Sequence, residues 1–333
     1  HPGLGIKSPR IYPHLKRRSR YPSAVNCNGN DTLMSSTAPV GFSAYQTIRH
    51  RLPATPRLGS CQRARHLGDI ADDYDVFLLD AYGVINRGTD AVLGVPERVR
   101  ELQAAGKRVM IVSNAAGFPH SVLMQRYAKL GYAFACEDVI TSRKTLVNRL
   151  QSEARRHWGM IAGAHFGPEE FPPLDYRLLG ADMADYDAAE GFLLVGASEW
   201  NEERQAMLVA SLKASPRPLF VANPDLIAPQ AGGHSTEPGT YAHQIMDATG
   251  VEPVFYGKPF GDIYSLALAR LEPETDLSRV IMVGDTLHTD ILGAHAAGLQ
   301  AALVTDTGVL AGMDINQAIA DSGIAPDWIL NQA

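Results

Sequence analysis

Cysteine is scarce in this chain. Its 333 residues include 3 cysteines, Cys27, Cys61 and Cys136. The number is odd, and no two of them have the CxxC spacing of a metal or redox site. A disulfide framework is therefore excluded as the main source of stability, and the pattern is typical of the reducing cytosol. We expect a cytoplasmic protein.

Long apolar runs are also missing. No run approaches the roughly 18–20 residues that a membrane-spanning helix needs, so we expect no membrane partner. The composition is 45% hydrophobic and 20% charged, which is ordinary for a soluble globular protein. A chain of this length is large enough for two domains with their own cores.

Acidic residues are nearly absent from the first 68 residues. This segment holds 11 Lys and Arg against one acid, Asp31; it carries +10 within a chain of net charge -6, so the remainder carries -16. It has no clear periodicity and is dotted with Pro, Ser and Gly, as in poorly ordered chain. It lacks the interleaved aromatic residues of a nucleic-acid-binding segment, and an Arg-rich targeting peptide is an alternative interpretation. We interpret residues 1–67 as a basic, poorly ordered N-terminal tail, with Met34, the first methionine, as a candidate native start.

From residue 68 onward, apolar strands alternate with helical segments. The pattern predicts buried strands at Val76–Leu79, Arg108–Val112 and Val280–Val283, and a helix at Asp290–Ala297. Strands that alternate with helices are typical of a doubly wound parallel sheet. The fold class expected is α/β, with a Rossmann-like core.

The middle of the chain has strands and helices of its own. The strands predicted there are Gly159–Ala162, Gly191–Val195 and Leu219–Ala222. We predict a core domain of residues 68–150 plus 251–333, with residues 151–250 inserted as a second α/β domain. One continuous large sheet is the alternative.

Four polar islands fall at the ends of predicted core strands. They are Asp80–Val84, Ile111–Asn114, Tyr256–Pro259 and Met282–Asp290. Each island alone has an ordinary explanation as a turn, a helix cap or a solvated loop. Parallel strands, however, bring their carboxyl ends to one edge of the sheet, so all four islands can converge on one pocket.

The residue types in these islands suit phosphoryl transfer. The carboxylate of Asp80 can attack phosphorus and form an acyl-phosphate. Because a carboxylate repels a phosphate dianion, the site needs positive charge, which Mg²⁺ on Asp80 and Asp285, together with Lys258, would supply. The Ser113 hydroxyl can donate to phosphate oxygens, and Gly83 lets the backbone approach a ligand closely.

In order and type, the four islands resemble the motifs of the haloacid-dehalogenase-like superfamily, in its class IIA branch of capped phosphatases. The resemblance runs from about Ile70 to Thr307. It also includes Arg87-Gly88, Ala222-Asn223-Pro224-Asp225, Glu237-Pro238-Gly239 and Gly250-Val251-Glu252-Pro253. Spacing agrees with this branch: 33 residues separate Asp80 from Ser113, too few for a cap domain, and 145 separate Ser113 from Lys258, enough for one.

The resemblance implies roles for individual residues. Catalytic roles fall to Asp80 as nucleophile, Tyr82, Ser113 and Lys258. Phosphate or substrate would be bound by Gly83, Ser113, Asn114, Lys258, Asn223 and Asp225. Metal would be bound by Asp80, the Tyr82 backbone carbonyl, Asp285 and Asp290.

Some of these roles have ordinary alternatives. Asp290 would support the metal shell or orient Lys258, and a helix start is its alternative. Asn223 and Asp225 would belong to a cap loop, and the alternative interpretation of these two residues is a simple Asn-Pro-Asp turn. The resemblance further implies a cap that closes over the pocket, a small phosphorylated metabolite as ligand, and pairing of two copies through the cap. From the composition of the N-terminal segment we expect no nucleic-acid partner.

Tyr82 departs from the family pattern. Superfamily phosphatases typically carry a second Asp there, which protonates the leaving group and then activates water, help worth about 10²–10⁴-fold. A tyrosine with a pKa near 10 is a poor base at neutral pH. Slow turnover, a substitute group such as His288 or Asn86, and phosphate binding without turnover are the open alternatives.

A 2-haloacid dehalogenase is a further alternative, because such enzymes resemble the chain at Asp80–Gly83. They carry their cap between the first two motifs, however, and lack the Gly-Asp-x-x-x-x-Asp metal motif present at Gly284–Asp290. We therefore favour a Mg²⁺-dependent phosphatase of a small phosphomonoester. The sequence leaves the natural substrate open.

Overall fold

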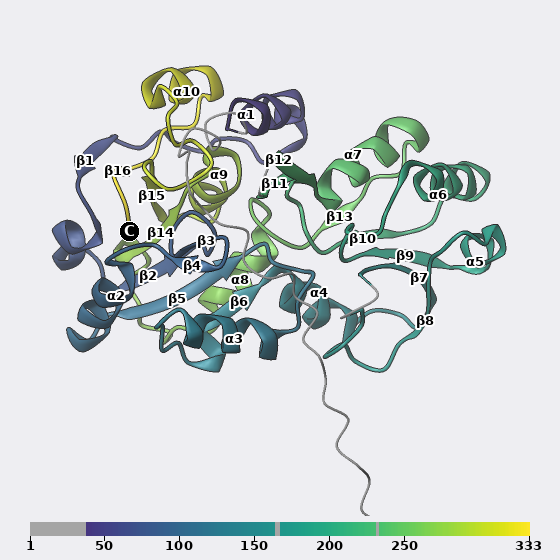
Figure 1. Ribbon diagram of the computed structural model, residues 1–333, viewed down its shortest axis with the longest axis horizontal. Helices are drawn as coiled ribbons and strands as arrows, with labels where there is room; N and C mark the ends of the chain where they lie inside the picture. Colours follow the sequence, from purple (N-terminus) through teal and green to yellow (C-terminus); the bar gives the residue numbers. More distant parts are fainter. Residues whose placement is uncertain (1–37, 164–166, 231–232) are drawn as a thin grey trace, which may run out of the picture. The chain divides into compact units, whose positions relative to one another are not determined.

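The computed structural model describes residues 38–163, 167–230 and 233–333. Their strands form two main sheets, of seven and five strands, and two short antiparallel hairpins (Figure 1). The alternative of one continuous large sheet is therefore wrong. In the described ranges, no helix is both long enough and apolar enough to cross a membrane.

The seven-stranded sheet has the order β1-β16-β15-β14-β2-β5-β6, and all its pairs are parallel. Its strands are β1 (Gln62–Ala64), β2 (Val76–Leu79), β5 (Arg108–Ser113), β6 (Val139–Thr141), β14 (Val280–Gly284), β15 (Gln300–Val304) and β16 (Trp328–Leu330). The helices of this part are α2 (Val95–Ala104), α3 (His120–Lys129), α4 (Ser142–Leu150), α8 (Gly261–Leu268), α9 (Leu292–Ala296) and α10 (Ile315–Ser322). Shorter helical segments are η3 (Leu67–Asp73), η4 (Cys136–Asp138), η5 (Leu277–Arg279) and the π-helix η6 (Leu287–Ile291).

Strand β2 shows that both faces of this sheet are covered. Phe77 and Leu79 belong to one buried apolar cluster, which includes residues of α2 and α3. Val76 and Leu78 belong to a second, which includes residues of α8 and α9. Successive side chains of a strand point to opposite faces, so a fully apolar strand has its place between two helical layers. The doubly wound α/β core predicted from the sequence is confirmed.

The five-stranded sheet has the order β13-β10-β9-β7-β8 and is also parallel. Its strands are β7 (His157–Ile161), β8 (Asp175–Leu178), β9 (Gly191–Leu194), β10 (Leu219–Val221) and β13 (Val254–Phe255), with helices α5 (Met183–Ala188), α6 (Glu202–Ala214) and α7 (Pro238–Thr249). The hairpins are β11 (Ile227–Gln230) with β12 (Gly233–Thr236), and β3 (Asn86–Arg87) with β4 (Asp90–Ala91). Because β13 pairs with β10, this sheet extends past residue 250, where the inserted domain was predicted to end.

The N-terminal segment differs from the predicted tail. Residues 1–37 lie outside the described residues, but α1 (Ala38–Thr47), η2 (Arg49–Arg51) and β1 follow them. The β1 region pairs with β16, near the other end of the chain: the Gly59 N–H donates to Ala325 O at 2.8 Å and the Gln62 N–H to Asp327 O at 2.9 Å. The prediction that the tail extends to residue 67 is wrong for residues 38–67, because partners so distant in sequence leave no local periodicity.

A partly buried ion pair holds this segment on the sheet. Arg57 donates two hydrogen bonds to the Asp327 carboxylate, at 2.6 and 2.8 Å. Burial alone would raise the pKa of Asp327, but hydrogen bonds from Arg57, His295 and the Ala301 N–H outweigh it and hold that pKa well below its usual range.

We expect Asp327→Asn to lower the free energy of unfolding at pH 7 by about 1–2 kcal/mol, since charge-assisted hydrogen bonds are lost. A lowered carboxyl pKa stabilises the fold above about pH 4, and this contribution is lost as pH falls through the folded-state value. The variant should therefore lose part of the acid sensitivity of the Tm between about pH 4 and 2. Thermal melts across pH check this, with exposed Asp306→Asn as the control; equal melts for both variants would contradict it.

Candidate active site

Three neighbouring strands of the seven-stranded sheet end in the polar islands. Asp80 follows β2, Ser113 closes β5 and Asp285 follows β14, and the sheet order places β2 between the other two. The convergence expected from parallel strands is what the structure shows: the three residues line one cavity with Lys258.

Lys258 connects two of the carboxylates. Its Nζ donates to Asp80 Oδ1 and to Asp290 Oδ1, both at 2.7 Å. Its side chain is 2% exposed. Burial disfavours the ammonium ion, but Asp290 and Asp80 outweigh it and raise the pKa of Lys258. Lys258 is therefore a fixed cation beside Asp80.

The carboxylates of Asp80, Asp285 and Asp290 form one cluster. Ligand oxygens from the three residues lie within 4.8 Å of one another. Burial raises the pKa of Asp80 to about 6, with Asp290 adding to the effect and Lys258 opposing it. Burial and the charges of Asp80 and Asp290 raise the pKa of Asp285 well above its usual range. A buried group of acidic oxygens with this excess of negative charge fits a hard divalent cation such as Mg²⁺.

Asp290 is held by groups of its own chain. Its Oδ2 accepts from the N–H groups of Asp285 and Thr286, both at 3.1 Å, and its Oδ1 accepts from Lys258. A Cβ at Gly284 would lie 2.1 Å from the Asp290 carboxyl carbon, so this approach requires glycine. The backbone here is the π-helix η6 rather than the start of the predicted helix at Asp290. Asp290 thus orients Lys258 and the Asp285 backbone.

Two hydrogen bonds fix the Asp285 carboxylate. Its Oδ1 accepts from the Thr286 hydroxyl and its Oδ2 from the Val309 N–H, both at 2.9 Å. Gly83 has a φ of 77°, and a Cβ there would lie 2.3 Å from Asp285 Oδ2. The structure therefore places Gly83, predicted as a phosphate-binding position, behind a carboxylate of the cluster.

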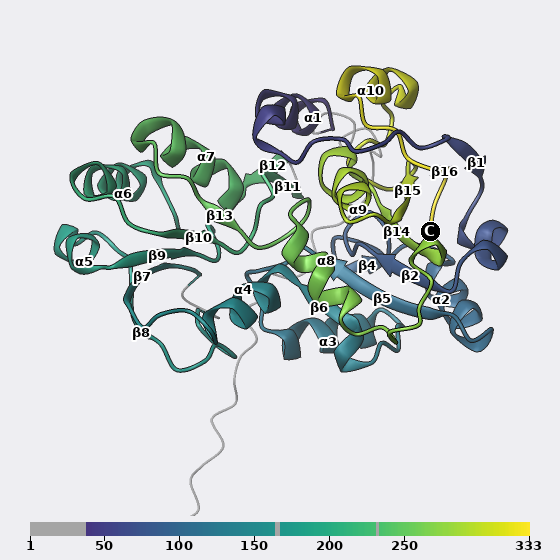
Figure 2. The same ribbon diagram turned by 180° about the vertical axis from the view of Figure 1, so that it is seen from behind.

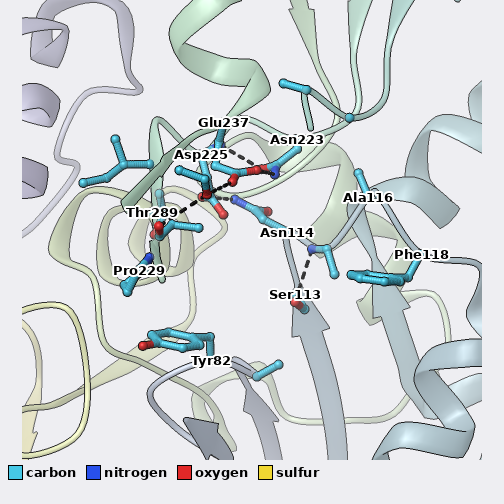
Figure 3. A pocket seen from close by; sticks show the side chains of 18 of the residues that line it. Tyr82, Ser113, Asn114, Ala116, Phe118, Asn223, Asp225, Pro229, Glu237 and Thr289 are labelled. Atoms are coloured by element: carbon cyan, nitrogen blue, oxygen red, sulfur yellow. Dashed lines mark hydrogen bonds between the residues drawn. The ribbon is translucent and has the colours of Figure 1, made fainter. Parts of the chain in front are cut away.

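Asn114 connects the islands to the loop that follows β10. Its Nδ2 donates to Asp225 Oδ1 at 2.8 Å and to Lys258 O at 3.0 Å, while its Oδ1 accepts from the Lys258 N–H at 2.7 Å. Figure 3 shows the Asn114 amide directed at Asp225. The side-chain amide thus holds Lys258 and this loop. Asn114 lies at the cavity, and its role as a phosphate- or substrate-binding residue stays a prediction. The neighbouring Ser113 Oγ accepts from the Ala115 N–H at 3.3 Å and keeps its own proton to donate.

Asn223 and Asp225 form an Asx turn at the same cavity. Asn223 Oδ1 accepts from the Asp225 N–H at 2.9 Å, and its Nδ2 donates to Glu237 Oε2 at 3.2 Å (Figure 3). Burial raises the pKa of Asp225 to about 7, against lowering by Asn114 and Lys258. Asn223 and Asp225 therefore form the turn that was their alternative interpretation. They also line the cavity, as predicted for a substrate-binding loop.

The cavity has a volume of about 750 Å³. Residues from both sheet regions line it. Those that the sequence did not indicate include Tyr45, Phe118, Arg126 and Tyr241. Tyr45 lies in the segment interpreted as tail, and the other three carry no motif, so only the folded arrangement identifies them.

Comparison with known proteins decides the family. A haloacid dehalogenase-like hydrolase model matches residues 77–169, and a second model of HAD-hydrolase-like proteins matches residues 255–332. Chronophin of Homo sapiens is 31% identical over 265 residues, which cover 76% of this chain and 88% of chronophin. This chain belongs to the haloacid dehalogenase-like hydrolase family.

Further relatives agree. The 4-nitrophenylphosphatase of Schizosaccharomyces pombe is 24% identical over 279 residues, covering 78% of this chain and 92% of that protein. The solved structure of p-nitrophenyl phosphatase from Archaeoglobus fulgidus shares the fold, with a TM-score of 0.66 at 23% identity over 78% of this chain and 97% of that one. The family membership predicted from the four islands is confirmed.

The side chain of Tyr82 is a phenol that stays neutral at pH 7, and it lies at the cavity. The side chain lines the cavity, and burial, with the charge of Asp285, raises its pKa above the usual value of 10. His288, a candidate substitute, is buried outside the cavity lining, with its Nε2 2.7 Å from Gln46 Oε1. Asn86 does line the cavity, but its Nδ2 donates to Gly88 O at 3.0 Å.

Proposed function

We propose that this hydrolase is a Mg²⁺-dependent phosphatase that cleaves a small phosphomonoester through an aspartyl-phosphate on Asp80. The observation that carries the proposal is the position of Asp80, which lies at the end of a buried strand, 2.7 Å from Lys258 Nζ and beside Asp285. Relatives named 4-nitrophenylphosphatase and D-glycerol 3-phosphate phosphatase support this reaction class.

The reaction has two displacements. An Asp80 oxygen attacks phosphorus, a P–O(Asp80) bond forms, and the ester P–O bond breaks as the leaving oxygen takes up a proton. Water then attacks the same phosphorus and gives up a proton to the solvent, which replaces the proton that the leaving oxygen took up. The P–O(Asp80) bond breaks, and inorganic phosphate leaves as the Asp80 carboxylate is restored. The net reaction converts ester and water to alcohol and phosphate.

The charges around Asp80 make this attack feasible. Lys258 and the Ser113 hydroxyl bind phosphate oxygens, and Asp290 keeps Lys258 in place. Asp80, Asp285 and the Tyr82 carbonyl would hold Mg²⁺, which supplies the positive charge that offsets the phosphate dianion. Tyr82 provides no carboxylate, so we propose fast cleavage of esters with good leaving groups and slow cleavage of alkyl esters.

Two alternatives are less well supported. A protein that binds phosphate without useful turnover would have the same Asp80 cluster. A measurement of phosphate release from an ester distinguishes such a protein from a phosphatase. A dehalogenase needs no metal, which does not suit the oxygen cluster of Asp80, Asp285 and Asp290. A homodimer, a cytoplasmic location and a small metabolite as substrate stay predictions.

Metal removal tests the proposal. We expect hydrolysis of 4-nitrophenyl phosphate with Mg²⁺ at a kcat of about 1 s⁻¹ or more, a loss of at least 100-fold in EDTA, and recovery with excess Mg²⁺. Equal rates with and without EDTA would refute the metal assignment. Calorimetric phosphate binding without any release from phosphate esters would instead favour the binding protein.

A further inference from the structure

Residues 40–52, here named the strap, lie against the cavity. Gly41 and Tyr45 of the strap are among the residues that line the cavity. Tyr45 is 5% exposed, and a Cβ at Gly41 would lie 3.1 Å from Ile227 Cδ1, so α1 packs closely on the β11–β12 hairpin. Both ribbon views place α1 between this hairpin and α10 (Figures 1 and 2).

On one side, the strap binds the region of the seven-stranded sheet. The Tyr45 ring stacks on His288 of η6, with centroids 5.4 Å apart and planes 11° apart. Gln46 Oε1 lies 2.7 Å from His288 Nε2, and Gln46 Nε2 donates to Asp321 O at 2.7 Å.

On the other side, the strap binds the residues that follow β10. The Tyr45 hydroxyl donates to Asp225 Oδ1 and accepts from the Leu226 N–H, each over a long 3.4 Å. Arg51 pairs with Asp247 of α7 and donates to the His243 carbonyl at 3.4 Å. Apolar contact accompanies these bonds, because Tyr45 and Leu226 share one buried cluster.

A continuous set of hydrogen bonds joins the strap to the catalytic lysine. The Tyr45 hydroxyl and Asn114 Nδ2 both donate to Asp225 Oδ1. Asn114 Oδ1 then accepts from the Lys258 N–H. Burial and Asp225 raise the pKa of Tyr45 well above 10, so its hydroxyl remains a donor at neutral pH.

We propose that the strap fastens the loop of residues 223–226 and α7 to the seven-stranded sheet, with Tyr45 as a positioning residue that fixes this loop and limits the size of the ester that the cavity accepts. The catalytic consequences rest on the phosphatase function proposed above. Tyr45 and Asn114 both line the cavity and both donate to Asp225 Oδ1. Loosening Tyr45 should therefore widen the cavity and release one restraint on the loop that Asn114 connects to Lys258.

The test compares Tyr45→Phe with Thr47→Val in the full chain. The first keeps the ring on His288 and removes only the hydroxyl. The second removes a hydroxyl of the same helix that is exposed and donates to Ser43 O within α1. One hydrogen bond of modest strength corresponds to roughly a twofold to fivefold change in an equilibrium.

In Tyr45→Phe we expect amide hydrogen exchange over residues 223–228 to become about threefold faster. The ratio of kcat/KM for 1-naphthyl phosphate over 4-nitrophenyl phosphate should rise about threefold, with a fall in kcat rather than a rise in KM for the smaller ester. Thr47→Val should match the parent protein in each measurement. Arg51→Gln should speed exchange over residues 243–247 in the same way.

The outcomes separate this proposal from the phosphatase function. Faster exchange in Tyr45→Phe and Arg51→Gln supports the strap even if no ester is hydrolysed, which would refute only the phosphatase. Unchanged exchange and an unchanged substrate ratio in an active Tyr45→Phe would overturn the strap and leave the phosphatase standing.

Discussion

Asp80→Asn should abolish phosphate release, with a fall in kcat of at least about 10⁴-fold on 4-nitrophenyl phosphate. An amide does not attack phosphorus as a carboxylate does, so the covalent route is lost. The remaining groups, Lys258 and Ser113, still bind the phosphoryl group but supply no nucleophile. Single-turnover measurements of nitrophenolate release with Mg²⁺ check the effect on chemistry separately from product release.

The fold should tolerate this change. Asn has the size of Asp, and burial already raises the pKa of Asp80 to about 6, so the folded state disfavours its charge. Lys258 keeps its second carboxylate partner, Asp290. We therefore expect a Tm near that of the parent protein. A folded variant that keeps more than about a hundredth of the parent rate would remove Asp80 from the nucleophile role.

The chemistry-bearing strand ends were predictable because each is a local pattern. An apolar run followed by a carboxylate or hydroxyl marks Asp80, Ser113 and Asp285, and the parallel sheet then brings them together. Lys258 could be predicted from its position in the third of the four islands along the chain. Family resemblance rests on the same local runs, which is why family and fold were both identified correctly.

The strap was unpredictable for the opposite reason. Tyr45 contacts His288 and Asp225, which are more than 150 residues away in the sequence, and β1 pairs with β16, the last strand along the chain. Such contacts leave no periodicity in the strap itself. A basic composition then gave the wrong interpretation of residues 38–67. The side-chain partners of Asn114 could not be predicted for the same reason, because Asp225 and Lys258 are distant from it in sequence.

Tyr82→Asp should raise the rate on an alkyl phosphate such as glycerol 3-phosphate by about 10²-fold, within the range of general acid–base help. An alkoxide leaves poorly without a proton, whereas 4-nitrophenolate needs none, so the gain on 4-nitrophenyl phosphate should be much smaller. Tyr82 is a weak substitute because burial and Asp285 raise its pKa above 10. The same surroundings would raise the pKa of an introduced Asp and keep a fraction protonated near neutral pH.

Two control variants separate the effect of an added acid–base group from the effect of removing the bulky tyrosine ring. Tyr82→Asn opens the same volume as Tyr82→Asp but cannot ionise, and Tyr82→Phe keeps the ring without its hydroxyl. We expect neither to gain activity on the alkyl ester. A gain in Tyr82→Asn equal to that in Tyr82→Asp would mean that the tyrosine ring obstructs the substrate rather than withholding a proton. No gain in a folded Tyr82→Asp would place the acid elsewhere in the cavity, where Asp225, whose pKa is raised to about 7 by burial, is the next carboxyl to replace.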